Sequence, residues 1–195
     1  MIPVEILENY NATLKQHHKG DVLFIEGETA QFYFQISSGN IKMFNLTEDG
    51  KEFVQGYFED GQAFAEPPLF GDFEYPASSI CTKDTSIYVL PKEVFFEVLK
   101  AYPEIHLNFT KLLSKRMFYK AKIMKEVSVY PPEHRIMTLL NHLKQSSGSS
   151  TLYEVELTRQ QISELTGLRV ETVIRAIKKL ESSKKLYIKE RKVYI

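Results

Sequence analysis

Short apolar runs alternate with glycine-containing turns early in the chain. Between Lys19 and Leu90, runs such as "VLFIEG", "FYFQISSG" and "EFVQGYF" are separated by turn signals, with glycines at positions 20, 27, 39, 50, 61 and 71. Turn signals about ten residues apart, between β-rich runs, are typical of an antiparallel sandwich or barrel. This part of the chain is therefore predicted to be all-β.

After Pro91 the apolar positions follow a helical period. "KEVFFEVLKAY" predicts a short helix, and Pro103 opens a longer one, "EIHLNFTKLLSKRMFYKAKIMKEV". Proline fits a helix start because its missing donor has no partner there anyway. Two apolar stripes run along the long helix: Ile105, Phe109, Leu112, Tyr119 and Ile123 form one, and Leu113, Met117, Met124 and Val127 form the other.

Two stripes on one helix require two surfaces. One stripe can pack on the β-domain, and the other suits the same helix of a second copy as a coiled-coil seam. The alternative is a single broad core face in a monomer. Pro131 and Pro132 then end the helix and predict a hinge or domain boundary near residues 128–131.

The segment "LTRQQISELTGLRVETVIRAIKKL" contains the signals of two short helices joined by a turn. Thr158 and Gln161 have capping-box spacing, which predicts that a helix starts directly after Thr158. Gly167 can end that helix in the left-handed conformation. A second helix from residue 169 or 170 would bury Val173, Ala176, Ile177 and Leu180. Since "RIMTLLNHLKQ" precedes this pair as a helix and "LYIKERKVYI" follows as a β-hairpin, a winged helix-turn-helix is predicted.

The outward face of the second helix carries the chemistry of base recognition. Its predicted outward residues are Arg169, Glu171, Thr172, Arg175 and Lys178. Glu171 and Arg175 lie one turn apart near the amino end of the helix. An arginine fork can take O6 and N7 of guanine together, and a carboxylate can accept from the amino group of cytosine. The alternative is an intrahelical ion pair that stabilises the helix by a few tenths of a kcal/mol.

The charge distribution agrees with this placement. The chain of 195 residues has no net charge, but residues 1–130 hold 13 basic and 18 acidic side chains, whereas residues 131–195 hold 12 basic and 7 acidic ones. A basic carboxyl-terminal part favours a polyanionic partner, although an imbalance of this size also arises by chance.

Other classes of protein find no support in the sequence. Cys81 is the only cysteine, so an intrachain disulfide and a four-thiolate cluster are excluded, and a reducing, cytoplasmic location is expected. Cys81 itself is interpreted as a buried strand residue rather than a redox switch. No apolar window suggests a signal peptide or a membrane span. No nucleophile elbow, P-loop, dinucleotide fingerprint or zinc spacing is present, so neither an enzyme nor a metal site is expected.

In its order of parts the chain resembles the Crp/Fnr family of bacterial transcription regulators. "LTRQQISELTGLRVETVIRAIKKLE" is similar to the family's DNA-binding signature, and "KGDVLFIEGE" and "GQAFAEPPLF" are similar to the turns that flank its effector pocket. The resemblance implies an α+β fold: an antiparallel, jelly-roll-like β-roll over 1–103, a dimerisation helix with hinge over 104–130, and a winged helix-turn-helix over 131–195. It further implies a homodimer through helix 104–128 that binds palindromic double-stranded DNA, and RNA polymerase as a partner.

The resemblance also assigns roles to individual residues. Glu171 and Arg175 match the family's base-reading pair, and the positions that match phosphate contacts are Thr158, Arg159, Gln160, Thr172 and Lys178. Many cAMP-responsive members carry an arginine just before the glutamate, where this chain has Val170, as the Fnr-like branch does. A half-site with a TGA core is therefore predicted.

The effector pocket that the resemblance implies departs from the cAMP-binding pattern. Glu66 matches the ribose-binding glutamate, but Pro76 and Ala77 stand at the arginine and serine positions that hold the phosphate. Because uncharged residues replace the cation poorly, an effector other than cAMP is expected, with a constitutively DNA-competent protein, a cAMP responder and a ligand-binding module without DNA as alternatives. The candidate pocket residues are Glu66, Phe70, Tyr75, Pro76, Ala77, Ser78, Ser79, Tyr119 and Lys120. Haem finds little support, since no histidine pair has metal-ligand spacing.

Overall fold

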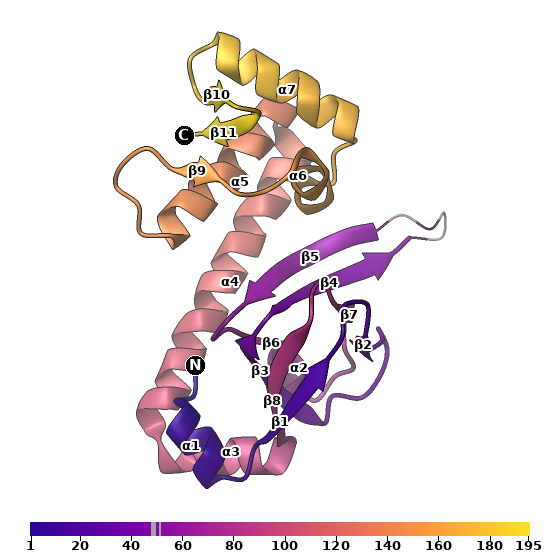
Figure 1. Ribbon diagram of the computed structural model, residues 1–195, viewed down its shortest axis with the longest axis vertical. Helices are drawn as coiled ribbons and strands as arrows, with labels where there is room; N and C mark the ends of the chain where they lie inside the picture. The colour runs from indigo at the N-terminus through magenta and orange to yellow at the C-terminus, as the bar shows by residue number, and fades with distance from the viewer. Residues whose placement is uncertain (48–49, 51) are drawn as a thin grey trace. The chain divides into compact units, whose positions relative to one another are not determined.

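The computed structural model describes residues 1–47, 50 and 52–195, which form two compact units, Met1–Lys115 and Arg116–Ile195 (Figure 1). The first unit contains two four-stranded antiparallel sheets, with strand orders β1-β8-β3-β6 and β2-β7-β4-β5. The strands are β1 (Thr13–His17), β2 (Val22–Phe24), β3 (Phe32–Ser38), β4 (Asn40–Leu46), β5 (Glu52–Glu59), β6 (Ala63–Phe64), β7 (Ser78–Cys81) and β8 (Thr85–Pro91). The prediction of an antiparallel sandwich or barrel is confirmed, and the two sheets form a sandwich.

Aromatic side chains fill the core of the first unit. Tyr33 on β3 is fully buried and stacks on Phe95, with ring centroids 4.7 Å apart. Between β3 and β4 the chain turns at Gly39 with φ of 125°, where a Cβ atom would lie 2.4 Å from the Thr85 hydroxyl oxygen. Only glycine fits this turn without displacing β8.

Helices α1 (Val4–Asn9), α2 (Pro67–Gly71), α3 (Lys92–Ala101) and the start of α4 (Pro103–Val129) complete the first unit. The sequence predicts α3 and α4 but not α1 or α2, which are too short for a helical period to be recognised. Ile105 and Phe109 on α4 are buried, and Leu112 packs against the same core. The first predicted stripe thus faces the β-sandwich over these three positions.

The second apolar stripe of α4 is largely exposed. The exposed fractions of Met117 and Met124 are 71% and 70%, and that of Phe118, which the sequence assigned to neither stripe, is 75%. Leu113 is half-buried, and the side chain of Val127 lies outside the described residues. Within a single chain, therefore, these methionines are not part of a core, and the interpretation of one broad monomer core face is wrong for them.

The second unit contains the carboxyl-terminal part of α4, three further helices and a small sheet. The three helices are α5 (Pro132–Ser146), α6 (Arg159–Thr166) and α7 (Val170–Ser182). Strand β9 (Glu154–Val155) lies between α5 and α6, and β10 (Tyr187–Lys189) and β11 (Lys192–Tyr194) follow α7. The strands form one sheet in the order β10-β11-β9. Ile136, Leu140, Ile162 and Val173 are completely buried in its core. The predicted winged helix-turn-helix is confirmed.

Candidate DNA-binding surface

The start of α6 is fixed by the predicted capping box. The backbone amide of Gln161 donates to Oγ1 of Thr158 at 3.1 Å, and the amide of Thr158 donates to Oε1 of Gln161 at 2.8 Å. These reciprocal bonds satisfy two donors that a helix start would otherwise leave without partners. Gly167 ends the helix with φ of 65°, in the left-handed conformation that the turn requires. The capping box and Gly167 therefore set the first and last residues of α6, and the turn to α7 begins at Gly167.

A hydrogen bond closes the turn between the two helices. The Ser163 hydroxyl donates to the carbonyl of Leu168 at 2.5 Å, and Ser163 itself is buried. On α7, the predicted inward residues Val173, Ala176, Ile177 and Leu180 are at most 4% exposed. Because this face is packed, the opposite face of α7 is held in a fixed orientation towards solvent.

That opposite face presents the predicted base-reading side chains. Glu171, Arg175, Lys178 and Arg169 are exposed, while Thr172 and Val170 are half-buried. Across residues 1–47, 50 and 52–195, no ion pair or hydrogen bond joins Glu171 to Arg175. The intrahelical ion pair is thus not formed, and the carboxylate and the guanidinium are both accessible to a partner.

Some polar residues near the base-reading pair are engaged in contacts within the domain, whereas Lys178 is exposed. Lys179 Nζ lies 2.7 Å from Oε1 of Glu133, which ties α7 to α5, and this contact lowers the pKa of Glu133. Gln160 on α6 donates to Glu164 at 2.9 Å. Lys178 points to solvent, so it is the lysine of α7 that is better placed for a phosphate.

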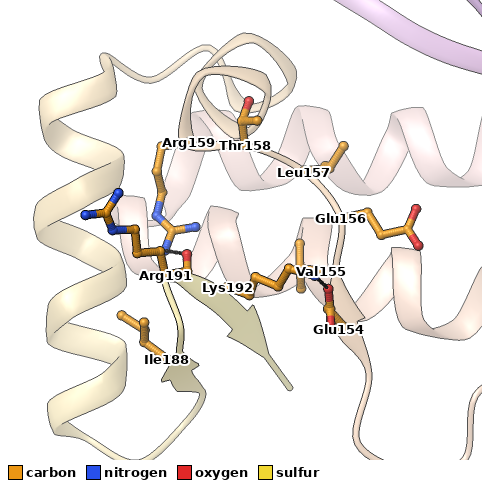
Figure 2. Close-up of a pocket in the computed structure, with 9 residues that line it drawn as sticks. All are labelled: Glu154, Val155, Glu156, Leu157, Thr158, Arg159, Ile188, Arg191 and Lys192. Atoms are coloured by element: carbon orange, nitrogen blue, oxygen red, sulfur yellow. Dashed lines mark hydrogen bonds and ion pairs between the residues drawn. The ribbon is translucent and has the colours of Figure 1, made fainter.

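Arg159 connects α6 with the hairpin β10–β11. Its Nη2 donates to the carbonyl of Arg191 at 3.5 Å, and burial lowers the pKa of its guanidinium. Figure 2 shows Arg159 reaching from the start of α6 towards Arg191. The two residues line a pocket of about 740 Å³. The pocket is lined by Glu154, Val155, Glu156, Leu157, Thr158, Arg159, Ile188, Arg191 and Lys192.

The hairpin turn has an unusual conformation for its residues. Lys189 pairs with Lys192, and the two residues between them, Glu190 and Arg191, have φ of 51° and 66°. A type I′ turn requires positive φ at both positions and usually carries asparagine and glycine there. Glu154 on β9 binds Lys192 and accepts from the Tyr194 hydroxyl at 2.8 Å, which anchors the hairpin. Arg191, an exposed cation beside Arg159, was not predicted from the sequence as part of this surface.

The candidate effector residues of the β-sandwich are mostly buried. Glu66, Ala77 and Ser79 are 0% exposed, and Tyr75 is 4% exposed, with its ring stacked 3.8 Å from that of Phe24. Burial raises the pKa of Tyr75 to about 12, so its phenol is neutral. The hydroxyl of Ser79 has no hydrogen-bond partner among the residues that the structure describes.

Other pocket candidates lie in different surroundings. Phe70 on α2 packs on the rings of Phe95 and Phe96, each 5.6 Å away, rather than forming a stack with Tyr75. Pro76 is exposed, and Oγ of Ser78 accepts from the amide of Glu26 at 3.0 Å. Neither Pro76 nor Ala77 carries charge, so these two positions supply no cation.

The last two pocket candidates lie on the part of α4 that belongs to the second unit. Tyr119 stacks on His142 of α5 with ring centroids 3.6 Å apart. Burial raises the pKa of the Tyr119 phenol to about 12. Lys120 is exposed. Tyr119 thus has an aromatic partner within the second unit. This contact was not predicted, because Tyr119 was assigned to the stripe of α4 that was expected to pack on the β-domain.

Histidines and Cys81 form no metal site in the part of the chain that the structure describes. His106 stacks on Phe70, and His134 on Tyr130. Cys81 is buried, and burial raises the pKa of its thiol, which disfavours the reactive thiolate. Among the described helices, none is long and apolar enough to cross a membrane.

Comparison with known proteins identifies the class. A model of the cyclic nucleotide-binding domain matches residues 14–102, and one of the Crp-like helix-turn-helix domain matches residues 134–195. The chain therefore belongs to the Crp/Fnr family, whose members are DNA-binding transcription regulators and not enzymes. It binds DNA through the helix-turn-helix, and proteins of this family typically dimerise.

Individual relatives are distant. The chain is 24% identical over 202 residues to the transcriptional activator protein anr of Pseudomonas aeruginosa, covering 100% of this chain and 82% of that protein. It is 27% identical over 172 residues to the cAMP-activated global transcriptional regulator CRP of Haemophilus influenzae, covering 86% and 77%. Its fold is similar to that of the c-di-GMP-responsive global regulator CLP of Xanthomonas campestris, with a TM-score of 0.76, 19% identity and 98% of each chain covered.

Proposed function

We propose that the chain acts as a homodimer that binds a palindromic DNA site, with α7 of each protomer in a major groove. The observation that carries this proposal is the accessible pair Glu171 and Arg175, held on the outward face of a helix whose other face is packed. In this role residues 1–103 form an effector-type domain, 104–130 the dimerisation helix and hinge, and 131–195 the DNA-binding domain.

Within the proposed complex the surface residues divide into base readers and phosphate contacts. Arg175 takes a guanine and Glu171 a cytosine amino group, in a half-site with a TGA core. The proposed phosphate contacts are Thr158, Arg159, Gln160, Thr172 and Lys178, and Arg169 and Val170 complete the proposed DNA-binding surface. With one recognition helix per protomer, the half-site centres lie roughly 10 bp apart. RNA polymerase is the proposed protein partner at the promoter.

Regulation is proposed to use an effector other than cAMP. Support comes from the uncharged Pro76 and Ala77, which supply no cation for a cyclic phosphate, and from the buried Ser79 hydroxyl. A buried hydroxyl without a partner costs about 1–3 kcal/mol, which a polar ligand atom would recover. The ring of Tyr75 occupies space beside Phe24, so such a ligand would displace it or stack on it.

The salt dependence of DNA affinity tests the phosphate contacts. The logarithm of the wild-type affinity should fall linearly with the logarithm of salt concentration, because each contact releases counterions. Lys178→Ala should weaken binding to every sequence and lower the slope by about two in a dimer, one contact per protomer. Fluorescence anisotropy titrations on specific and scrambled duplexes measure both. An unchanged slope would remove Lys178 from the phosphate contacts, and a slope near zero for the wild type would contradict the proposed function.

A further inference from the structure

The recognition helix α7 carries an exposed apolar side chain, Ile174. Ile174 is 40% exposed. The apolar residues of the packed face of α7 are at most 4% exposed: Val173, Ala176, Ile177 and Leu180. Ile174 is not among the DNA-binding residues predicted from the sequence, because that prediction used the charged positions of "VETVIRAIKKL". Its exposure indicates that Ile174 belongs to the outward face.

Helix geometry places Ile174 beside the base-reading pair. At 3.6 residues per turn, Ile174 is displaced by about 60° from Glu171 around the helix, and Lys178 follows it one turn later. Val170, one turn before Ile174, is half-buried on the same side. Val170 and Ile174 therefore form a short apolar strip that runs next to the polar strip of Glu171 and Arg175.

The major groove offers one apolar feature to such a strip. The base edges present hydrogen-bond donors and acceptors, which an isoleucine cannot use, and the 5-methyl group of thymine, which it can contact favourably. Resting on the proposed function, we infer that Ile174 contacts the 5-methyl group of a thymine in each half-site, next to the base pairs read by Glu171 and Arg175. Ile174 is then a specificity-determining residue that selects thymine through apolar contact.

Removal of the methyl group from the DNA tests this contact without altering base pairing. Each thymine of the selected half-site is replaced in turn by deoxyuridine, symmetrically in both half-sites, and the affinity of the full chain is measured by fluorescence anisotropy. At one position the wild type should lose about fourfold in affinity per half-site, the effect of one buried methyl group. Deoxyuridine at the other positions should leave the affinity unchanged.

Two variants make the test specific to this side chain. Ile174→Ala should bind thymine and deoxyuridine duplexes equally, whereas Ile174→Val, which keeps the branched surface, should retain the discrimination. Because Ile174 is exposed, thermal unfolding by circular dichroism should show the same midpoint for the wild type and both variants. Equal sensitivity to deoxyuridine in Ile174→Ala would overturn the inference.

The inference and the proposed function fail in different ways. If the wild type selects a palindrome but tolerates deoxyuridine at every thymine, Ile174 does not read a methyl group and the proposed function stands. A selected half-site without thymine would contradict both the inference and the TGA core of the proposed half-site. If no duplex sequence is preferred at all, both are wrong.

Discussion

Glutamate at both Met117 and Met124 is expected to convert the protein into a monomer and to lower its affinity for a palindromic site by about 100-fold or more. The two side chains are seven residues apart on α4 and 71% and 70% exposed in a single chain, as coiled-coil seam positions are before the partner helix packs on them. Charges at both positions would have to be buried without partners in a dimer. Loss of the dimer removes the second half-site contact, and such linkage typically contributes 10²–10⁴-fold to affinity.

Analytical ultracentrifugation measures the mass of each variant, and anisotropy on the palindrome measures its affinity. Met117→Leu with Met124→Leu is the matched control, because it keeps an apolar seam and should remain a dimer. A double glutamate variant that sediments as a dimer would show that protomers associate through another surface. A monomer with unchanged affinity would show that one DNA-binding domain is sufficient.

Alanine at Arg175 is expected to remove sequence discrimination worth about 1–3 kcal/mol per half-site, the value of a bidentate contact to guanine. Arg175 is exposed and, among the described residues, is not engaged by Glu171, so its guanidinium is available to a base. The expected loss is confined to the cognate palindrome. Affinity for scrambled DNA should fall only slightly, since the missing group reads a base and not a phosphate.

Competition titrations with guanine-substituted half-sites measure this discrimination. Lys178→Ala is the matched control, because it removes a neighbouring cation from the same helix and should weaken all sequences alike. If Arg175→Ala weakened all sequences alike while Lys178→Ala lost discrimination, the two roles would have to be exchanged.

The helix-turn-helix could be predicted from the sequence because its signals are local. The capping box of Thr158 and Gln161 and the left-handed Gly167 act within a few residues, and both are present in the structure. The exposure of Ile174 and the approach of Arg159 to Arg191 depend instead on how α7 and the hairpin pack. Spacing along α7 could have placed Ile174 on the outward face, but an apolar residue is expected in a core by default.

The β-sandwich could be predicted as a class, but its interior could not. Turn spacing indicates antiparallel strands, whereas the partner of each aromatic ring is decided by tertiary packing. Phe70 and Tyr75 are close in sequence, yet Phe70 packs on α3 and Tyr75 stacks on Phe24. The stack of Tyr119 on His142 joins residues from two helices separated by Pro131 and Pro132, which no local pattern indicates.

The most direct test of the central claim, sequence-specific recognition by α7, is a selection from random double-stranded DNA with the purified full chain. It is followed by anisotropy on the selected and a scrambled duplex at two salt concentrations, before and after addition of cAMP. We predict a palindrome with half-site centres roughly 10 bp apart, bound at least about 10³-fold more tightly than the scrambled duplex, weakened by salt and unaffected by cAMP. Equal affinity for both duplexes would contradict the claim, and a gain of affinity with cAMP would contradict the account of the effector pocket.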